Sequence, residues 1–284
     1  MSEKHFNSPE EIAEAFVVIA EKKVGRDHIK TMILAGLAGA FIAFAAEGSN
    51  MAAFNLLASA STYGLGKALA GLMFSTGLMM VVIAGADLFT GNNLIVVGVM
   101  EKRVSILDFL LNLLIVYVGN FIGSMCIVYM VNVSGLLNSG GYELGAITLK
   151  IASGKVSLSF IQAFVLGIMC NWLVCLAVWM GYAAKDISGK VLAILFPIWL
   201  FVTSGFEHSI ANMYYIPAGI LLKSSPKVVE KAVSLGLSTD VLAHLNWSTF
   251  VVDNLVPVTL GNLIGGSFCV GVIYWYVYIR RKLC

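Results

Sequence analysis

Charged residues are scarce in this sequence. Asp, Glu, Lys and Arg make up 12% of the 284 residues, whereas 59% are hydrophobic, and the mean hydropathy is +0.88. Soluble domains carry roughly 25% charged residues, so this composition excludes that class and indicates an integral membrane protein in a lipid bilayer. The net charge of only +2, without a run of Lys or Arg, argues against a nucleic-acid partner.

Several chemical motifs are also absent. The five cysteines show neither CxxC spacing nor a histidine partner, so we expect buried thiols rather than a metal site or a disulfide framework. There is no nucleophile, metal-ligand set or cofactor motif, which argues against an enzyme and predicts no cofactor. The charged, amphipathic N-terminus predicts no cleavable signal peptide. The cysteines are Cys126, Cys170, Cys175, Cys269 and Cys284.

Six apolar stretches are long enough to cross a bilayer, which takes about 20 helical residues. We expect membrane-spanning helices near 31–58, 66–100, 105–135, 157–184, 190–222 and 247–280. The second and the fifth stretches are each interrupted by a polar motif, which predicts broken helices. Backbone outside a helix is tolerated at membrane depth only beside protein or a water-lined cavity, so both breaks should face a pathway.

The two interruptions share one motif, in which a glycine is followed by one residue, an acid, four residues and an asparagine. An acid at the centre of a membrane span costs about 2.5 to 3.5 kcal/mol, so two at matching places predict a shared polar site. We expect the acids to hold the loops by accepting backbone N–H groups, with proton relay as the alternative. The motif residues are Gly85, Asp87 and Asn92, and then Gly205, Glu207 and Asn212.

The repeat continues outside this motif. The third stretch carries Asn112, Gly119-Asn120 and Ile122-Gly123, and the sixth carries Asn254, Gly261-Asn262 and Ile264-Gly265 with the same internal spacing. The first and fourth stretches match less well, through Ala35-Gly36 and Leu166-Gly167. Three crossings in each half force the halves into opposite orientations. The sequence therefore predicts an all-α membrane protein with an inverted repeat of three plus three helices. We place repeat one at about 31–135 and repeat two at about 157–281, within a transmembrane channel domain of 31–284.

Positive charge predicts the orientation of the chain. With both termini cytoplasmic, 12 of the 18 Lys and Arg residues fall inside, which favours that topology. Residues 1–30 form a predicted N-terminal cytoplasmic amphipathic helix, with Ser8 and Pro9 at its start and Ile12, Ala15 and Phe16 on its apolar face. We expect this helix to lie on the membrane or on a neighbouring subunit; a gate over the inner mouth is the alternative.

Among the polar residues of the spans, His208 has the strongest functional indication. It is the one histidine within a predicted span, it stands beside Glu207 at a break, and we expect it to lie level with Thr90 in the opposite loop. Its ordinary pKa of about 6.5 suits a proton donor. A structural imidazole that joins two loops is the alternative. Antiparallel helix ends at the breaks would attract an anion without a fixed charge.

Buried amides and apolar side chains surround this position. Asn171, Asn212 and Asn262 must be hydrogen-bonded, either in a pore lining or as loop supports. The apolar walls would form constrictions that a hydrated ion crosses at high cost if they converge on the polar centre; their alternative role is simple packing. They are Phe74, Leu78, Leu88 and Phe201.

The segments ADLFTGN, CNWLVCLAVWM, SGFEHSIANM and VTLGNLIGG together resemble the formate/nitrite transporter family over nearly the whole chain. The resemblance implies an aquaporin-like six-helix protomer, a homopentamer, and one pore in each protomer. By position it implies His208 as the central histidine with Thr90 as its partner, Asn171 and Asn262 at the pore centre, and Lys155 in the outer vestibule. It also implies Asp87 and Glu207 as loop-holding acids and the four apolar residues named above as the slits.

The sequence therefore predicts a channel of the inner (plasma) membrane for small monovalent weak-acid anions. ADLFT resembles the formate-type members, so we expect formate, with nitrite, hydrosulfide, acetate and lactate as further permeants. The expected mechanism is attraction at Lys155, passage through a slit, and transient protonation or hydrogen bonding at His208 and Thr90. A nitrite or hydrosulfide channel and a proton-coupled formate carrier remain open. A membrane enzyme or proton relay is the alternative from another class.

Overall fold

The computed structural model describes residues 6–280, and its secondary structure is helical. Six of its helices are long and apolar enough to cross a membrane, in agreement with the predicted number. They are α2 (His28–Leu57), α3 with its π-helical end (Tyr63–Gly85), α6 (Ile106–Val133), α8 (Phe160–Ala183), α9 (Ile187–Ser204) and the continuous helix α13 to α15 (Trp247–Tyr278).

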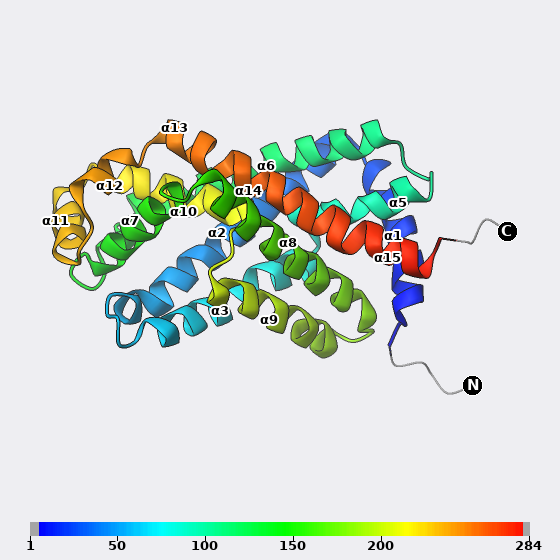
Figure 1. The fold of residues 1–284 in the computed structure, drawn as a ribbon, viewed down its shortest axis with the longest axis horizontal. Coiled ribbons are helices and arrows are strands. Elements are labelled where there is room, and N and C mark those ends of the chain that lie inside the picture. The colour runs from blue at the N-terminus through cyan, green and yellow to red at the C-terminus, as the bar shows by residue number, and fades with distance from the viewer. Residues whose placement is uncertain (1–5, 281–284) are drawn as a thin grey trace.

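Two shorter apolar helices complete the broken spans. After α3 the chain resumes as α4 (Phe89–Asn92), a 3-10 turn and α5 (Val96–Met100), and after α9 it resumes as α10 (Ser209–Leu222). Figure 1 shows the connection from α9 to α10 as an extended segment in the middle of the molecule. The predicted breaks in the second and fifth spans are therefore present.

The last span is not a uniform α-helix. It starts with α13 (Trp247–Thr249), passes through a π-helical stretch (Phe250–Leu255) into α14 (Val256–Leu263), and reaches α15 (Ile273–Tyr278) through a second π-helical stretch, Ile264–Val272. Such π-helical segments often occur at functional sites, because they shift the register of side chains within a helix. Here they flank the segment of α14 that packs against α8.

Glycines explain why the third and sixth spans repeat their spacing. A methyl group built on Gly123 of α6 would lie 1.9 Å from the carbonyl oxygen of Gly36 in α2. One built on Gly265 would lie 2.2 Å from the carbonyl oxygen of Ile168 in α8. Small residues allow membrane helices to approach backbone to backbone, so α6 crosses α2 as the last span crosses α8.

The N-terminal helix α1 (Pro9–Val24) begins with the predicted cap. The Ser8 hydroxyl accepts from the backbone N–H of Glu11, whose carboxylate accepts from the N–H of Ser8. Phe16 stacks on Trp179 of α8 with ring centroids 5.0 Å apart. Part of the apolar face is therefore covered by this chain itself, and contact of the helix with the membrane or another subunit stays a prediction.

Three further helices, α7 (Glu143–Val156), α11 (Pro226–Ser234) and α12 (Thr239–His244), lie outside the spans. They gather at one end of the molecule, while α1 and α15 lie together at the other (Figure 1). Residues 223–246, a polar segment for which the sequence indicates no site, contain α11 and α12.

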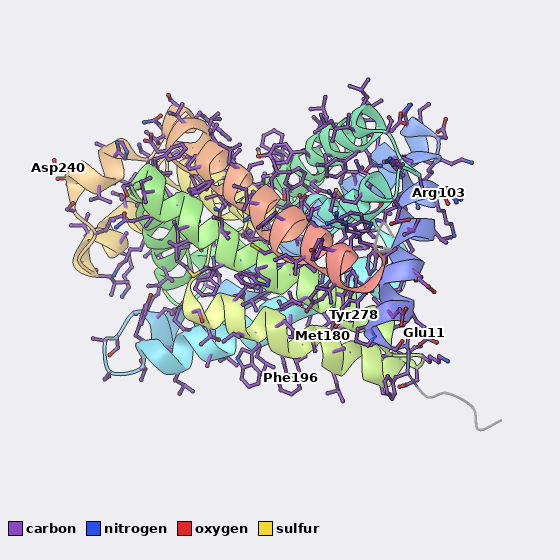
Figure 2. All side chains as sticks on the ribbon, turned by 45° about the vertical axis from the view of Figure 1, so that its right-hand side comes forward. Glu11, Arg103, Met180, Phe196, Asp240 and Tyr278 are labelled. Atoms are coloured by element: carbon purple, nitrogen blue, oxygen red, sulfur yellow. The ribbon has the colours of Figure 1, made fainter. Side chains whose placement is uncertain are left out.

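Large apolar side chains cover the outside of the bundle. Phe196 and Leu107 are 58% and 75% exposed, and both lie on membrane-spanning helices. Figure 2 shows Phe196 and Met180 directed away from the ribbon. A soluble protein rarely exposes apolar surface this widely, so these side chains form the face expected against lipid.

Candidate functional site

The two breaks have the same backbone geometry. Gly85 and Gly205 have φ values of 87° and 80°, in the left-handed region that favours glycine. The next backbone N–H in each loop donates to a carbonyl oxygen of the preceding helix: Ala86 to Val81 at 2.8 Å, and Phe206 to Phe201 at 3.1 Å. The glycine of the repeated motif therefore ends the first half-helix.

One buried asparagine holds each loop. Asn120 accepts from the backbone N–H of Phe89 at 2.9 Å, and donates to the carbonyl oxygens of Ala35 at 2.8 Å and Asp87 at 3.0 Å. All these groups come from the first half of the chain. The side chain therefore ties the loop and the restarting helix to α2.

Asn262 makes the same three bonds in the second half. It accepts from the N–H of Ser209 at 2.9 Å and donates to the carbonyl oxygens of Gly167 at 2.8 Å and Glu207 at 3.0 Å. The sequence left two roles open for this amide, and the structure places it as a loop support. Asn120, its counterpart in the first repeat, was not predicted as a site residue, although the repeated Gly-Asn pair could have indicated it.

These bonds also correct the register between the first and fourth spans. The N–H of Asp87 donates to the carbonyl oxygen of Leu34, and that of Glu207 donates to Leu166, both at 3.3 Å. Leu34 and Ala35 thus correspond to Leu166 and Gly167. The predicted match of Ala35-Gly36 to Leu166-Gly167 is one residue out of register, because a single short pair in apolar helices carries little information.

Basic side chains bind the acid of the first loop. The Asp87 carboxylate accepts from Nζ of Lys23 and from Nη1 of Arg26, and Lys23 also donates to Oδ1 of Asn92 at 2.6 Å. Asn92 in turn donates to Asn112 at 2.9 Å. The loop and the end of α1 are joined by this network.

The second loop has the matching network. The Glu207 carboxylate accepts from Nζ of Lys155 at 2.7 Å and from Nδ2 of Asn212 at 2.7 Å and Asn254 at 3.3 Å. Lys155 is 11 residues before Leu166, and Lys23 is 11 before Leu34. This equal spacing could have predicted Lys23 as the counterpart of Lys155. It also means that each repeat starts before the predicted boundaries at 31 and 157.

The acids do not cap the restarting helices as expected. Among the described residues neither carboxylate accepts a backbone N–H; both accept from side chains. The N-terminal N–H groups of Phe89, Ser209 and Ala211 bind Asn120, Asn262 and His208. The expectation that helix N-termini present free N–H groups to an anion is therefore wrong for these three groups.

His208 uses its two ring nitrogens differently. Nδ1 accepts from the backbone N–H of Ala211 at 3.0 Å and so caps α10, while Nε2 lies 3.1 Å from Oγ1 of Thr90. Because an acceptor Nδ1 carries no proton, the neutral ring has its proton on Nε2, which donates to Thr90. Protonation of Nδ1 would break the cap. His208 therefore presents one N–H group at the meeting point of the two loops.

Asn171 binds the backbone carbonyl of Thr90. Its Nδ2 donates to the carbonyl oxygen of Asn262 at 2.7 Å and to that of Thr90 at 3.3 Å. Cys175 donates to the same oxygen of Thr90 at 3.2 Å. All four residues are fully buried. The arrangement fixes the backbone at Thr90, so the hydroxyl stays directed at the imidazole.

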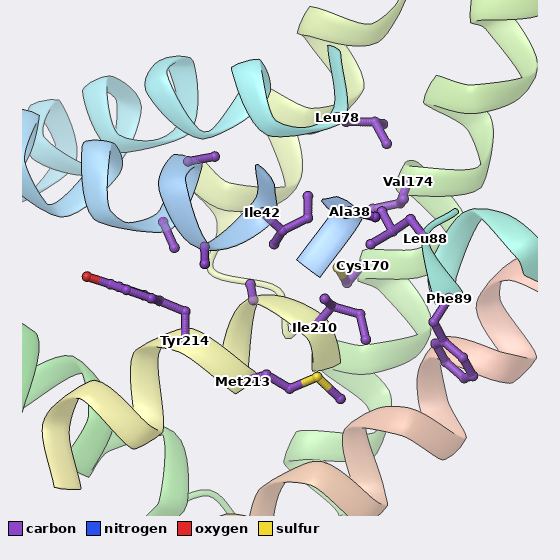
Figure 3. Packing of buried hydrophobic residues seen from close by; sticks show 14 of the residues in the cluster. Ala38, Ile42, Leu78, Leu88, Phe89, Cys170, Val174, Ile210, Met213 and Tyr214 are labelled. Carbon is purple, nitrogen blue, oxygen red and sulfur yellow. The ribbon is translucent and has the colours of Figure 1, made fainter. Parts of the chain in front are cut away.

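Two groups of apolar side chains lie near this pair. The rings of Phe74 and Phe201 have centroids 5.7 Å apart and lie 6.4 and 5.9 Å from that of His208. Leu78 and Leu88 form a second layer, and Figure 3 shows them among the buried residues near Val174. Each of these four apolar side chains is at most 3% exposed.

A cavity lies beyond each layer. The larger, here called the α7-side cavity, has a volume of about 410 Å³, and its lining includes Phe74, Phe201, His208, Glu207 and Lys155. The smaller, the α1-side cavity, has about 200 Å³, and its lining includes Leu78, Leu88, Asp87, Lys23 and Arg26. Phe74, Phe201 and His208 thus border one cavity, and Leu78 and Leu88 border the other. That these apolar residues act as slits stays a prediction.

Both linings carry an excess of positive charge. Lys67, Lys150 and Lys155 face one acid, Glu207, in the α7-side cavity, and Lys23 and Arg26 face Asp87 in the α1-side cavity. Of these five bases, Lys155 alone was predicted as a site residue. Within residues 6–280, no cluster of His, Cys, Asp and Glu could hold a metal ion. The site is suited to attract a small anion and to strip its water.

Comparisons with known proteins agree with this geometry. A model of the formate/nitrite transporter family matches residues 10–276. The "Probable formate transporter" of Methanothermobacter thermautotrophicus is 39% identical over 97% of this chain and 98% of its own length. The "Formate channel FocA" of Escherichia coli K12 is 39% identical over 92% and 90%.

Solved structures give the same result. A "Pentameric formate channel with formate bound" is 38% identical, with a TM-score of 0.78 over 89% of this chain and 98% of its own. An "FNT family ion channel" is 27% identical, with a TM-score of 0.76 over 94% and 98%. Family match, sequence identity and fold coincide over nearly the full length. The chain therefore belongs to the formate/nitrite transporter family.

Proposed function

We propose that this protein is a membrane channel for formate. The observation that carries the proposal is the polar pair of His208 and Thr90 between two apolar layers, with a positively lined cavity on either side. Relatives at 39% identity are named as formate transporters or channels, and a solved structure at 38% identity is described with formate bound. A small carboxylate fits this arrangement.

The anion is drawn into a cavity by its positive charge and then meets an apolar layer. No Lys or Arg is among the residues of the two layers, so nothing there holds the anion by a full charge. Desolvation is the main barrier, because a bare carboxylate loses its water between Phe74 and Phe201. A channel needs a site that binds well enough to admit the ion and weakly enough to release it.

At the barrier, His208 offers its Nε2–H group to a formate oxygen in place of Thr90. The Thr90 hydroxyl is then free to donate to the second oxygen. Both partners are neutral, so the exchange replaces water without fixing the ion. Full proton transfer is the second scheme; it would require an imidazolium whose Nδ1–H no longer caps α10.

We further propose a homopentamer with one pore in each protomer, in the inner (plasma) membrane, with both termini cytoplasmic. The pentameric description of the similar structure supports the assembly. The excess of Lys and Arg in segments assigned to the inside supports the orientation, which puts the α1-side cavity inside and the α7-side cavity outside. Nitrite, hydrosulfide, acetate and lactate are proposed as further permeants.

Uptake by the purified protein in liposomes tests the function. Formate, nitrite and hydrosulfide are offered separately at equal concentration and at two pH values, while current is recorded. We expect formate to move fastest. Current in proportion to flux supports passage as the anion, whereas faster flux at acid pH without matching current supports proton transfer. Faster movement of nitrite or hydrosulfide would refute the choice of formate, and no flux above empty liposomes would refute the channel.

A further inference from the structure

The α7-side cavity holds three lysines that differ in their partners. Lys155 binds Glu207 at 2.7 Å and also lies over the ring of Tyr215, with 5.4 Å from Nζ to the centroid. Lys150 donates to the carbonyl oxygen of Leu235 at 2.7 Å. For Lys67, neither a hydrogen bond nor an ion pair is formed with any described residue. Lys67 is therefore the lysine of this lining whose ammonium group no described residue binds directly.

Lys67 is half-buried and stands close to the break. A methyl group built on Gly205 would lie 3.8 Å from its Nζ. The ammonium group thus sits beside the residue that ends α9, two positions before Glu207 and three before His208. The C-terminal end of a helix favours a nearby cation without neutralising it, which explains why the charge is tolerated here.

Comparison of equivalent positions in the two repeats identifies the residues that support the loops. Asp87 and Glu207 are 120 residues apart, as are Asn92 and Asn212, and each half binds its acid through a lysine. Lysine at 155 is thus part of a support that both halves share.

Lys67 has no such counterpart. The residue 120 positions later is Ile187, which is exposed on α9. His208 breaks the repeat in the same way, since its counterpart is Leu88. Lys67 and His208 therefore lie outside the lysine–acid support that both halves share.

We propose that Lys67 is the anion-binding group of the α7-side cavity, where its ammonium holds a monovalent carboxylate before it passes Phe74 and Phe201. This inference rests on the proposed function and moves the attracting role from Lys155 to Lys67. In the α1-side cavity both bases are bound to Asp87, so the directly unbound ammonium of Lys67 gives the two mouths different affinities.

The test replaces the charge and then restores it chemically. Lys67→Cys is purified, reconstituted and compared with the parent before and after treatment with aminoethyl or sulfonatoethyl methanethiosulfonate, which add groups of similar size and opposite charge. The parent treated with each reagent controls for its own cysteines. Lys223→Cys is the matched control, because Lys223 also donates to a backbone oxygen, that of Leu245 at 2.6 Å, but is not part of the cavity lining.

We expect Lys67→Cys to raise the half-saturating formate concentration roughly tenfold, at the lower end of what charge focusing contributes. The aminoethyl group should restore most of the affinity and the sulfonatoethyl group none. Lys223→Cys should change the half-saturating formate concentration less than twofold. Lys67→Arg, which keeps the charge, should match the parent.

Equal half-saturation in the parent and Lys67→Cys, or equal effects of the two reagents, would overturn the role of Lys67 and leave the channel standing. No formate flux in the parent would overturn the proposed function, and this inference with it.

Discussion

Because the two ring nitrogens of His208 have different partners, their contributions to stability and to transport can be tested separately. Nδ1 caps α10 and Nε2 faces Thr90, so one substitution can keep the first contact and remove the second. His208→Asn places a short amide oxygen at the N-cap, where Asn is among the best residues, but it cannot reach Thr90. His208→Phe removes both contacts.

The structure gives the expected magnitudes. Loss of an N-cap costs about 1 kcal/mol, and loss of a buried hydrogen bond that leaves a hydroxyl unpaired costs about 1 to 3 kcal/mol. His208→Asn should lose only the second contribution and His208→Phe both. If formate passes by exchanging with Thr90 at Nε2, both variants should lose at least about tenfold in flux, since one such bond to a charged group contributes at least about 1.5 kcal/mol.

Thermal unfolding of the purified variants and formate uptake in liposomes measure the two effects separately. Thr90→Val is the matched control, because it removes the acceptor of Nε2–H and leaves the cap on Ala211 in place. Parent-like uptake by His208→Asn would refute the role of Nε2. Equal loss of stability in His208→Asn and His208→Phe would refute the cap.

Three further predictions concern the scaffold. Asn262→Ala removes three hydrogen bonds and should lower the free energy of unfolding by about 3 kcal/mol, which thermal unfolding would show as a lower midpoint. Exposed Asn55→Ala is the control. An unchanged midpoint in Asn262→Ala would contradict the loop-support role. Gly123→Val should prevent α6 from meeting α2 and abolish the monodisperse peak in gel filtration; a normal peak would refute the close crossing. Lys155→Met should lower the free energy of unfolding by about 3 kcal/mol, because it leaves Glu207 buried without its cation. Adding Glu207→Gln should recover part of this loss. If the losses of the two single variants simply add in the double variant, thermal unfolding would show that the pair is not coupled.

Long-range pairing explains which residues the sequence analysis missed. The ion pair of Lys23 and Asp87 joins residues 64 positions apart, and that of Lys155 and Glu207 joins residues 52 apart. A lysine outside the apolar spans gives no local sign that its side chain reaches a loop inside them. Lys67 was missed for another reason, since it begins a predicted span and resembles an ordinary interfacial lysine.

Particular features could be predicted because their cause is local. Apolar length determines the six spans, and Gly85 and Gly205 mark the breaks because only glycine readily takes the positive φ that ends the half-helix. Three crossings per half determine the inverted repeat. The repeat alignment placed Thr90 level with His208, and the family resemblance implied that the two are partners. Their contact of 3.1 Å is a product of the fold.

The sequence by itself determined the membrane class, the broken helices and the repeat, because hydrophobic length and glycine conformation act over a few residues. The tertiary structure alone decided that Asn262 supports a loop, that His208 caps α10 through Nδ1, and that Lys155 is neutralised by Glu207 while Lys67 is not. Hydrogen bonds and ion pairs depend on distances of about 3 Å between segments far apart in the chain. Only the packing of the helices sets those distances.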